Sequence, residues 1–273
     1  MLGKLLKHEF RATGRLMLPA LGAVLVLAVL ANLSIRFIQV TDSVFLSILF
    51  GLVITAFVIG MIAMCVMTLV LMVLRFYRNL LRDEGYLMHT LPVTEHQLVW
   101  SKLIVSLVWS LVTFLVIGLI ILLTVLLQTG TSLGELFAQF PSWAEIRQAM
   151  AEVGLRGGDL WLLGGEVLLA LLLGTLSSYM HFFAAMALGH MFSKDKVLLS
   201  ILFFVGLSIV LSIFQTGFHM TLVFRVEPTI DTVRQMLNLV HGVAGRALLA
   251  ELIQAAALYL ATTLSLQKKL NLP

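Results

Sequence analysis

Long apolar runs alternate with short polar segments along this chain. Six runs reach or exceed 18 residues, the usual criterion for a helix that crosses a bilayer: residues 16–35, 44–74, 98–127, 160–190, 197–219 and 243–265. The pattern predicts an all-α fold, a polytopic membrane helix bundle with six transmembrane helices. The second run has 31 residues and fits one long tilted helix, which leaves counts of five or seven spans open.

The composition supports a membrane protein. Hydrophobic residues make up 60% of the chain and charged residues 12%, against about 25% charged residues in soluble domains. Six spans in 273 residues leave little room for a soluble domain, so we expect one transmembrane domain over residues 1–273. The single cysteine, Cys65, lies inside the second run and excludes a disulfide framework or a cysteine-based metal site. We expect no bound metal and no nucleic-acid partner.

The basic residues predict the orientation. With both termini and the even-numbered connections in the cytoplasm, 12 of the 18 basic residues fall inside, and most acidic residues fall outside. The inside set is Lys4, Lys7, Arg11, Arg15, Arg75, Arg78, Arg82, Lys102, Lys194, Lys196, Lys268 and Lys269. The positive-inside rule therefore favours two cytoplasmic ends.

The N-terminal segment, residues 1–15, is amphipathic at helical spacing. Its basic residues Lys4, Lys7, Arg11 and Arg15 recur at three- and four-residue steps, and leucines occupy the opposite arc. We expect an interfacial connecting helix whose basic side faces anionic lipid. Ordinary positive-inside residues on a frayed end are the alternative.

Two longer connections are expected outside the membrane, at residues 128–159 and 220–242. In the first, Ser142 is expected to cap a helix that starts at Trp143, with Glu145 in its first turn and Gly157 and Gly158 at its end. The second contains Pro228 and candidate caps, Thr229 or Asp231, for a short helix. Each connection is either a lid or a covered loop.

Common catalytic signatures are missing from the sequence. It has no phosphate-binding G-x-x-x-x-G-K-[ST] loop, no G-x-S-x-G turn and no H-E-x-x-H zinc helix. Energy for uphill transport must then come from an ion gradient or from another subunit. Ionisable residues inside the runs are therefore functional candidates, and Glu166, Glu251 and Gln254 are a possible substrate cavity. Structural pairing is the alternative, with Arg246 as the expected partner of Glu166.

The segment between the second and third runs has strong local signals. Pro92 ends any preceding helix, and Thr94 with Gln97 forms the pattern of a capping box that starts the third span. Upstream, Asp83 and Glu84 favour the N-terminus of a short helix, and Gly85 permits a tight turn. We expect a short, charged element over residues 83–93.

This segment, DEGYLMHTLPVTEHQLVWSK, resembles the cytoplasmic connection between the second and third spans of type-two ABC-exporter permeases. The six-span plan and the basic amphipathic N-terminal segment are similar to that family too. The resemblance implies that residues 83–93 form a coupling helix that docks on an ATPase. Its residues would include Asp83, Glu84, Gly85, Tyr86, Leu91 and Pro92, with Thr94 and Lys102 at the family's hydroxyl and lysine positions. The long connection at 128–159 departs from the family, whose large external element usually precedes the sixth span.

The resemblance implies the permease subunit of a bacterial cell-membrane ABC exporter that moves an amphipathic or hydrophobic peptide, lipid-like molecule or drug. The chain itself would not be an enzyme and would bind no cofactor, because ATP and Mg²⁺ would sit on separate ATP-binding cassette subunits. A second permease chain, identical or related, and the lipid bilayer would be its other partners. Two alternatives stay open: a non-transporting scaffold or sensor subunit, and an ion-coupled transporter acting alone.

Overall fold

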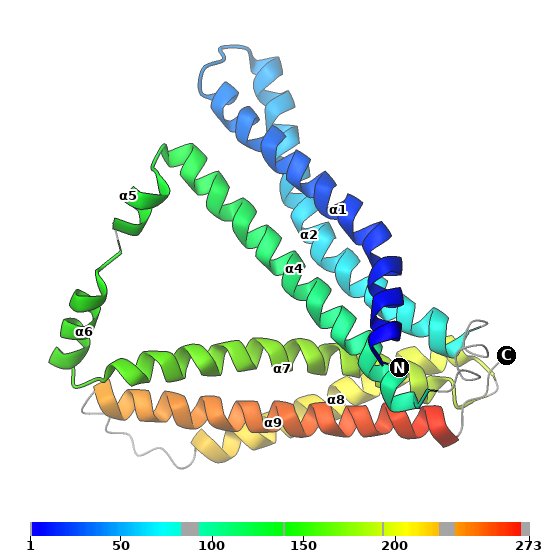
Figure 1. The fold of residues 1–273 in the computed structure, drawn as a ribbon. Coiled ribbons are helices and arrows are strands. Elements are labelled where there is room, and N and C mark those ends of the chain that lie inside the picture. Colours follow the sequence, from blue (N-terminus) through cyan, green and yellow to red (C-terminus); the bar gives the residue numbers. More distant parts are fainter. Residues whose placement is uncertain (1, 83–92, 139, 193, 224–232, 269–273) are drawn as a thin grey trace. The chain divides into compact units, whose positions relative to one another are not determined.

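The computed structural model describes residues 2–82, 93–138, 140–192, 194–223 and 233–268, and every regular element within these ranges is helical (Figure 1). Six helices are long and apolar enough to cross a membrane. They are α1 (Leu2–Ile38), α2 (Val44–Leu81), α4 (Glu95–Thr129), α7 (Gly157–Gly189), α8 (Lys196–Val223) and α9 (Val233–Lys268). Two short helices, α5 (Leu133–Ala138) and α6 (Trp143–Glu152), lie between α4 and α7. The prediction of an all-α, multi-pass membrane protein is confirmed.

The helix α1 is longer than the apolar run it contains. It continues through Pro19 and includes the amphipathic segment, so residues 2–15 are its first turns. That these turns lie in the membrane interface stays a prediction. A proline inside a helix removes one backbone hydrogen bond, yet α1 continues beyond Pro19 and Gly22 to Ile38. The basic side chains Lys4, Lys7, Arg11 and Arg15 are all exposed, as the amphipathic pattern predicts.

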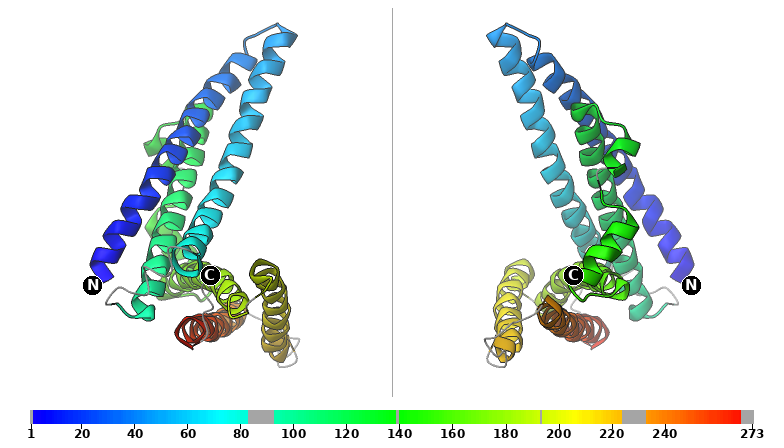
Figure 2. Two further views of the ribbon diagram at one scale, coloured as in Figure 1. Left: turned by 90° about the vertical axis from the view of Figure 1, so that its right-hand side faces the viewer. Right: turned by 90° about the vertical axis from the view of Figure 1, so that its left-hand side faces the viewer.

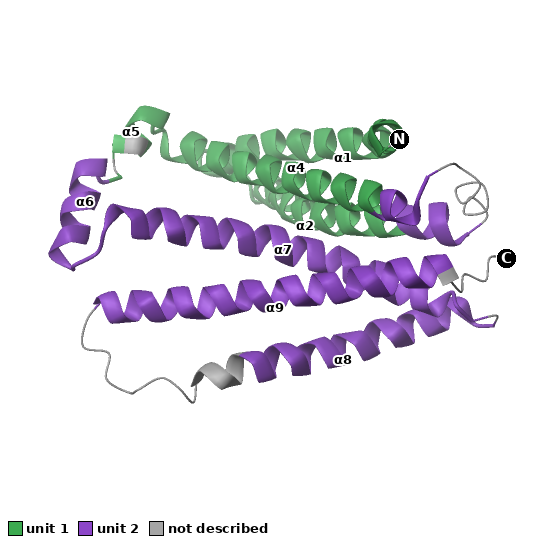
Figure 3. Ribbon diagram, turned by 60° about the horizontal axis from the view of Figure 1, so that its bottom comes forward, with its two compact units in different colours: residues 1–74, 100–140 green, residues 75–99, 141–273 purple. Residues whose placement is uncertain are grey.

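The chain forms two compact units (Figure 3). Unit 1 contains residues 1–74 and 100–140, and unit 2 contains residues 75–99 and 141–273. The long helices α2 and α4 contribute to both, because the ends of the two helices that flank residues 82–94 belong to unit 2 and the remainder to unit 1. A single permease domain over residues 1–273 stays a prediction.

In unit 1, the long parts of α1, α2 and α4 lie side by side (Figure 2). A stripe of small and apolar residues on α1 is buried, including Met17, Leu21 and Ala28. A hydrogen bond of 3.0 Å joins the hydroxyls of Thr68 on α2 and Thr113 on α4. Because both hydroxyls are buried, this bond satisfies polar groups that would otherwise be costly inside an apolar bundle.

In unit 2, α7 packs against both α8 and α9. α7 approaches α8 closely at Gly189, where an added Cβ would lie 2.5 Å from the backbone nitrogen of Ser200. Only glycine fits there without a shift of the backbone. The end of α2 joins this unit through Phe76, whose ring stacks on Phe183 with centroids 3.9 Å apart.

The connection before α7 confirms one expected cap and corrects the expected end of α6. Ser142 caps α6, and its hydroxyl and backbone amide exchange hydrogen bonds with Glu145, as a capping box requires. The helix ends before Gly154, which has a φ of +75°, whereas Gly157 is the first residue of α7. The left-handed conformation that favours glycine occurs at Gly154, so the glycine pair was the wrong stop signal. Thr229 and Asp231 lie outside the described residues.

Candidate functional site

The expected docking residues, Asp83, Glu84, Gly85, Tyr86, Leu91 and Pro92, lie outside the described residues, and the structure shows only what flanks them. After this segment, Thr94 immediately precedes α4. Its carbonyl accepts from the amides of Gln97 (2.9 Å) and Leu98 (3.1 Å), and its hydroxyl lies 3.4 Å from the Gln97 amide nitrogen. This arrangement satisfies two amides of the first turn that have no partner within the helix.

The helix ends beside this segment are held by several contacts within unit 2. On α2, the Tyr77 ring meets the edge of His190, with centroids 5.4 Å apart. On α4, Nδ1 of His96 lies 2.7 Å from the hydroxyl of Tyr259 on α9. Together with the stack of Phe76 on α7, these contacts tie both flanks of residues 83–92 to α7 and α9.

A cavity of about 450 Å³ with both apolar and charged lining opens where the end of α2 meets the junction of α7 and α8. Arg82, Lys196 and His190 line it, together with Asp195. Burial lowers the pKa of His190, and Lys196 and Arg82 lower it further, while a hydrogen bond to the Met186 carbonyl opposes them. His190 is therefore held towards its neutral form beside two permanent cations.

A buried ion pair joins α1 to α4 within unit 1. Nζ of Lys102 lies 2.5 Å from Oε1 of Glu9, and these residues are 3% and 5% exposed. One turn further along, the indole of Trp109 donates to the hydroxyl of Thr13 at 2.8 Å. Lys102 was singled out in the sequence, but Glu9 was missed. Its signal was its position on the apolar arc of the amphipathic segment, three or four residues from Leu5, Leu6 and Thr13.

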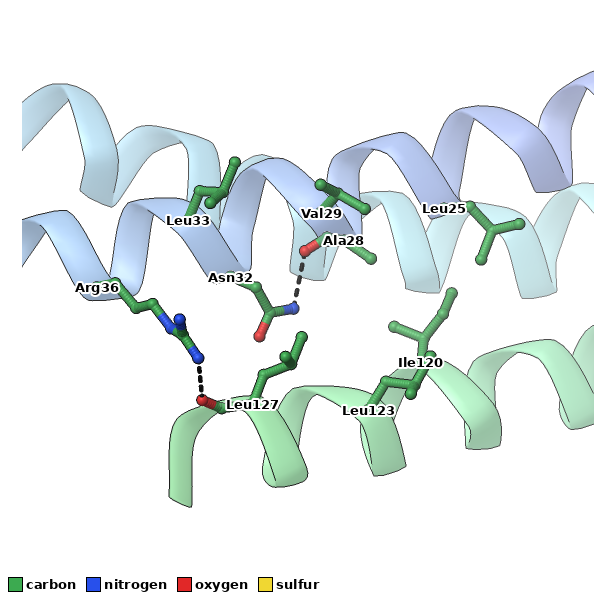
Figure 4. Close-up of a pocket in the computed structure, with 9 residues that line it drawn as sticks. All are labelled: Leu25, Ala28, Val29, Asn32, Leu33, Arg36, Ile120, Leu123 and Leu127. Atoms are coloured by element: carbon green, nitrogen blue, oxygen red, sulfur yellow. Dashed lines mark hydrogen bonds between the residues drawn. The ribbon is translucent and has the colours of Figure 1, made fainter. Parts of the chain in front are cut away.

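A mostly apolar pocket of about 190 Å³ lies between the C-terminal parts of α1 and α4 (Figure 4). Leucine, isoleucine, valine and alanine side chains form most of its wall, and Asn32 and Arg36 are its polar members. Both are engaged: Asn32 donates to the Ala28 carbonyl (2.8 Å) and Thr124 (3.0 Å), and Arg36 donates to the Leu127 carbonyl (2.7 Å). The polar groups of this pocket hold α1 against α4.

Glu166, one of the three expected cavity residues, pairs with a histidine. Its Oε2 lies 2.8 Å from Nδ1 of His241 on α9. The expected partner Arg246 is exposed instead. His241 was missed in the sequence because it lies before the sixth apolar run, whereas α9 starts at Val233 and carries that histidine alongside α7.

Glu251 and Gln254, the other two expected cavity residues, lie in one hydrogen-bonded cluster. The side-chain amide of Gln215 on α8 donates to Glu251 (3.2 Å) and to the side-chain oxygen of Gln254 (2.9 Å). Gln254 in turn donates to the hydroxyl of Ser177 on α7 at 2.8 Å. Gln215 and Ser177 were not anticipated, since single neutral polar residues in apolar runs are common.

The three expected cavity residues form two separate groups. Ten residues of α9 separate His241, the partner of Glu166, from Glu251, a rise of about 15 Å. Another ionisable residue of α7, His181, belongs to neither group, because its Nε2 lies 3.2 Å from the carbonyl oxygen of Phe204 on α8. Over the described ranges, no group of three or more histidine, cysteine, aspartate or glutamate residues has the arrangement needed to hold a metal ion. Unit 2 therefore contains two separate polar groups between its apolar helices, one around Glu166 and one around Glu251.

Comparison with protein-family models, curated proteins and solved structures gives no match for this chain.

Proposed function

We propose that this chain is the permease subunit of an ABC exporter, in which separate ATPase subunits dock on the connection around residues 83–93. The chain would lie in the cell membrane with both termini in the cytoplasm, and would pair with a second, identical or related permease. Its substrate would be an amphipathic or hydrophobic molecule. ATP and Mg²⁺ would bind to the ATPase subunits.

The division of α2 and α4 between the two units is the observation that supports this proposal best. Both helices change from unit 1 to unit 2 within one or two turns of the segment that resembles a coupling helix. A force applied to residues 83–93 would act on helix ends that are packed on α7 and α9 through Phe76 and His96. The same two helices continue into unit 1. A movement of this segment would therefore act on the ends of both helices.

The exposed surface of the long helices supports further partners in the membrane. Large apolar side chains are exposed along α2, α7 and α8, among them Ile59, Leu171 and Ile213. Exposed apolar surface on this scale needs lipid or another protein to cover it. A paired permease would cover part of this surface, and lipid the rest.

Docking can be tested by expressing the chain with a candidate ATP-binding cassette ATPase and purifying the complex through a tag on the permease. We expect Glu84→Arg and Gly85→Trp to reduce both co-purification and the rate of ATP hydrolysis. Glu152→Arg, the same charge reversal at an exposed position on α6, is the matched control. Unchanged assembly and hydrolysis in both docking variants would overturn the proposal.

The pairing of Glu166 with His241 favours a second candidate, an ion-coupled transporter acting alone. A carboxylate and an imidazole at 2.8 Å can exchange a proton. This candidate expects uptake driven by a proton gradient in vesicles that contain the chain and no ATPase, with loss of uptake in Glu166→Gln. Uptake that requires an ATPase subunit would exclude it.

A further inference from the structure

The carboxylate of Glu251 lies near the middle of α9 and is only partly satisfied. Its Oε1 accepts a hydrogen bond from Gln215, whereas its Oε2 is buried and has no hydrogen-bond partner among the described residues. No ion pair involves Glu251 within the described ranges, and Arg246, one and a half turns away on the same helix, is exposed. An ionised carboxylate at the centre of a membrane helix costs about 2.5 to 3.5 kcal/mol on insertion scales. A positively charged partner beside the carboxylate would offset this cost.

The surrounding amides orient Glu251 but do not neutralise it. Gln215 uses its amide nitrogen for both Glu251 and Gln254, and the amide nitrogen of Gln254 is directed to Ser177. Gln254 is 9% exposed and Ser177 is 2% exposed, so the cluster is built into the packing of α7, α8 and α9. Both amide hydrogens of Gln215 and one of Gln254 are used in these bonds. The buried polar atom of the cluster that has no hydrogen-bond partner among the described residues is Oε2 of Glu251.

These features select the chemistry of a ligand. An acceptor with a full negative charge fits a donor with a positive charge, and an ammonium group supplies three donors. A divalent metal ion would need several carboxylate or carbonyl ligands, and the described residues bring only one carboxylate to this cluster. The apolar faces of α8 and α9, with Ile213 and Leu252 exposed, suit a hydrocarbon tail attached to that ammonium.

We propose that Glu251, positioned by Gln215 and Gln254, binds the ammonium group of an amphipathic amine. As a transport site this rests on the proposed exporter function, because it names the class of substrate that the exporter would carry. Binding itself requires neither the ATPase nor ATP. The binding site can therefore be tested apart from the exporter function.

The test is equilibrium binding of radiolabelled dodecylamine, which is protonated at neutral pH, to the purified chain in nanodiscs of zwitterionic lipid. Empty nanodiscs give the partitioning background. We expect saturable binding that unlabelled dodecylamine displaces and dodecanol, with a tail of the same length, does not. Glu251→Gln should weaken binding at least about tenfold, which corresponds to about 1.4 kcal/mol. Glu152→Gln, on the exposed surface of α6, should leave binding unchanged.

Two further variants keep the test decisive if Glu251→Gln fails to fold. Glu251→Asp retains the charge but withdraws the carboxylate by one methylene, and Gln215→Leu removes the amide that orients it; both should weaken binding less than the loss of the charge. Equal displacement by dodecanol, or full binding in all three site variants, would overturn the proposal. Absent amine binding, with an infrared band of a protonated carboxyl that disappears in Glu251→Gln, would also overturn it and would identify a proton as the occupant. None of these results depends on whether an ATPase docks.

Discussion

The buried pair of Glu9 and Lys102 gives the sharpest prediction for stability. Lys102→Met keeps most of the side-chain volume but removes the ammonium that lies 2.5 Å from the Glu9 carboxylate. Removing one partner of a buried pair typically destabilises a protein by about 3 to 5 kcal/mol, because the other charge stays buried without it. We therefore expect Lys102→Met and Glu9→Met each to lower the free energy of unfolding by about 3 kcal/mol or more.

The double variant separates a buried charge pair from ordinary packing. When both partners are replaced by apolar groups of similar size, the cost of burying charge disappears and stability is restored or even improved by about 1 to 4 kcal/mol relative to the pair. Glu9→Met with Lys102→Met should accordingly be more stable than either single variant. A double-mutant cycle expresses this difference as a coupling energy between the two sites.

Unfolding in detergent micelles, followed by tryptophan fluorescence during a denaturant titration, measures these free energies. Trp109 is a suitable reporter, because its indole bonds Thr13 one turn from the pair. Lys7→Met, on the exposed side of α1, is the control and should change stability by less than about 0.5 kcal/mol. The reasoning would be refuted if Lys102→Met behaved like this control, or if the two single effects simply added.

Three other predictions concern unit 2. Gly189→Ala should destabilise the protein by about 1 to 3 kcal/mol, because its Cβ would meet the backbone of Ser200. Gly164→Ala, which has open space around it on the same helix, should be neutral or stabilising when the melting temperatures of the two variants are compared. Burial lowers the pKa of His190. The stability that neutral His190 contributes should therefore be complete above about pH 6.5 and decline as pH falls through the lowered pKa. Melting temperatures measured against pH, with His190→Asn as the reference, test this dependence. Hydrogen bonds at the cap of α6 lower the pKa of Glu145, so amide protection in α6 should be complete above pH 4.5 and fall as pH drops through the lowered pKa.

Each of these predictions has a result that contradicts it. Equal melting temperatures for the two glycine variants would mean that α7 and α8 can separate at no cost. An identical pH dependence with and without His190 would show that its burial carries no energetic weight. Unchanged protection of α6 under acid would show that the carboxylate of Glu145 contributes nothing to the cap.

The fold was largely predictable from the sequence because membrane helices have a strong and simple signature. A run of apolar residues that is long enough to cross the bilayer leaves few alternatives to a helix, and six such runs gave six long helices. The ends were less predictable. Helices α1 and α9 extend well beyond their apolar runs, because a helix continues into polar sequence until a cap or a turn residue stops it.

The polar contacts were less predictable than the helices that carry them. Glu166, Glu251 and Gln254 stood out because ionisable and amide groups are rare in apolar runs, but their partners depend on how helices distant in sequence pack. His241 lies 75 residues after Glu166, and Gln215 lies 36 residues before Glu251. Helical periodicity identifies neighbours on one helix, and it contains no information on the register between two helices. Glu9 was hidden for a different reason, since its charge matched the polar character of the segment around it.

The most direct test of the account is a photo-crosslink between the segment that resembles a coupling helix and an ATPase. A photoreactive amino acid replaces Tyr86, and in a second variant it replaces the exposed Trp143 on α6. Both are expressed in native membranes together with a candidate ATP-binding cassette ATPase and then irradiated. We predict a crosslink to the ATPase from position 86 that changes in yield when a non-hydrolysable ATP analogue is added, and none from position 143. No crosslink from position 86, or equal yields from both positions, would contradict it.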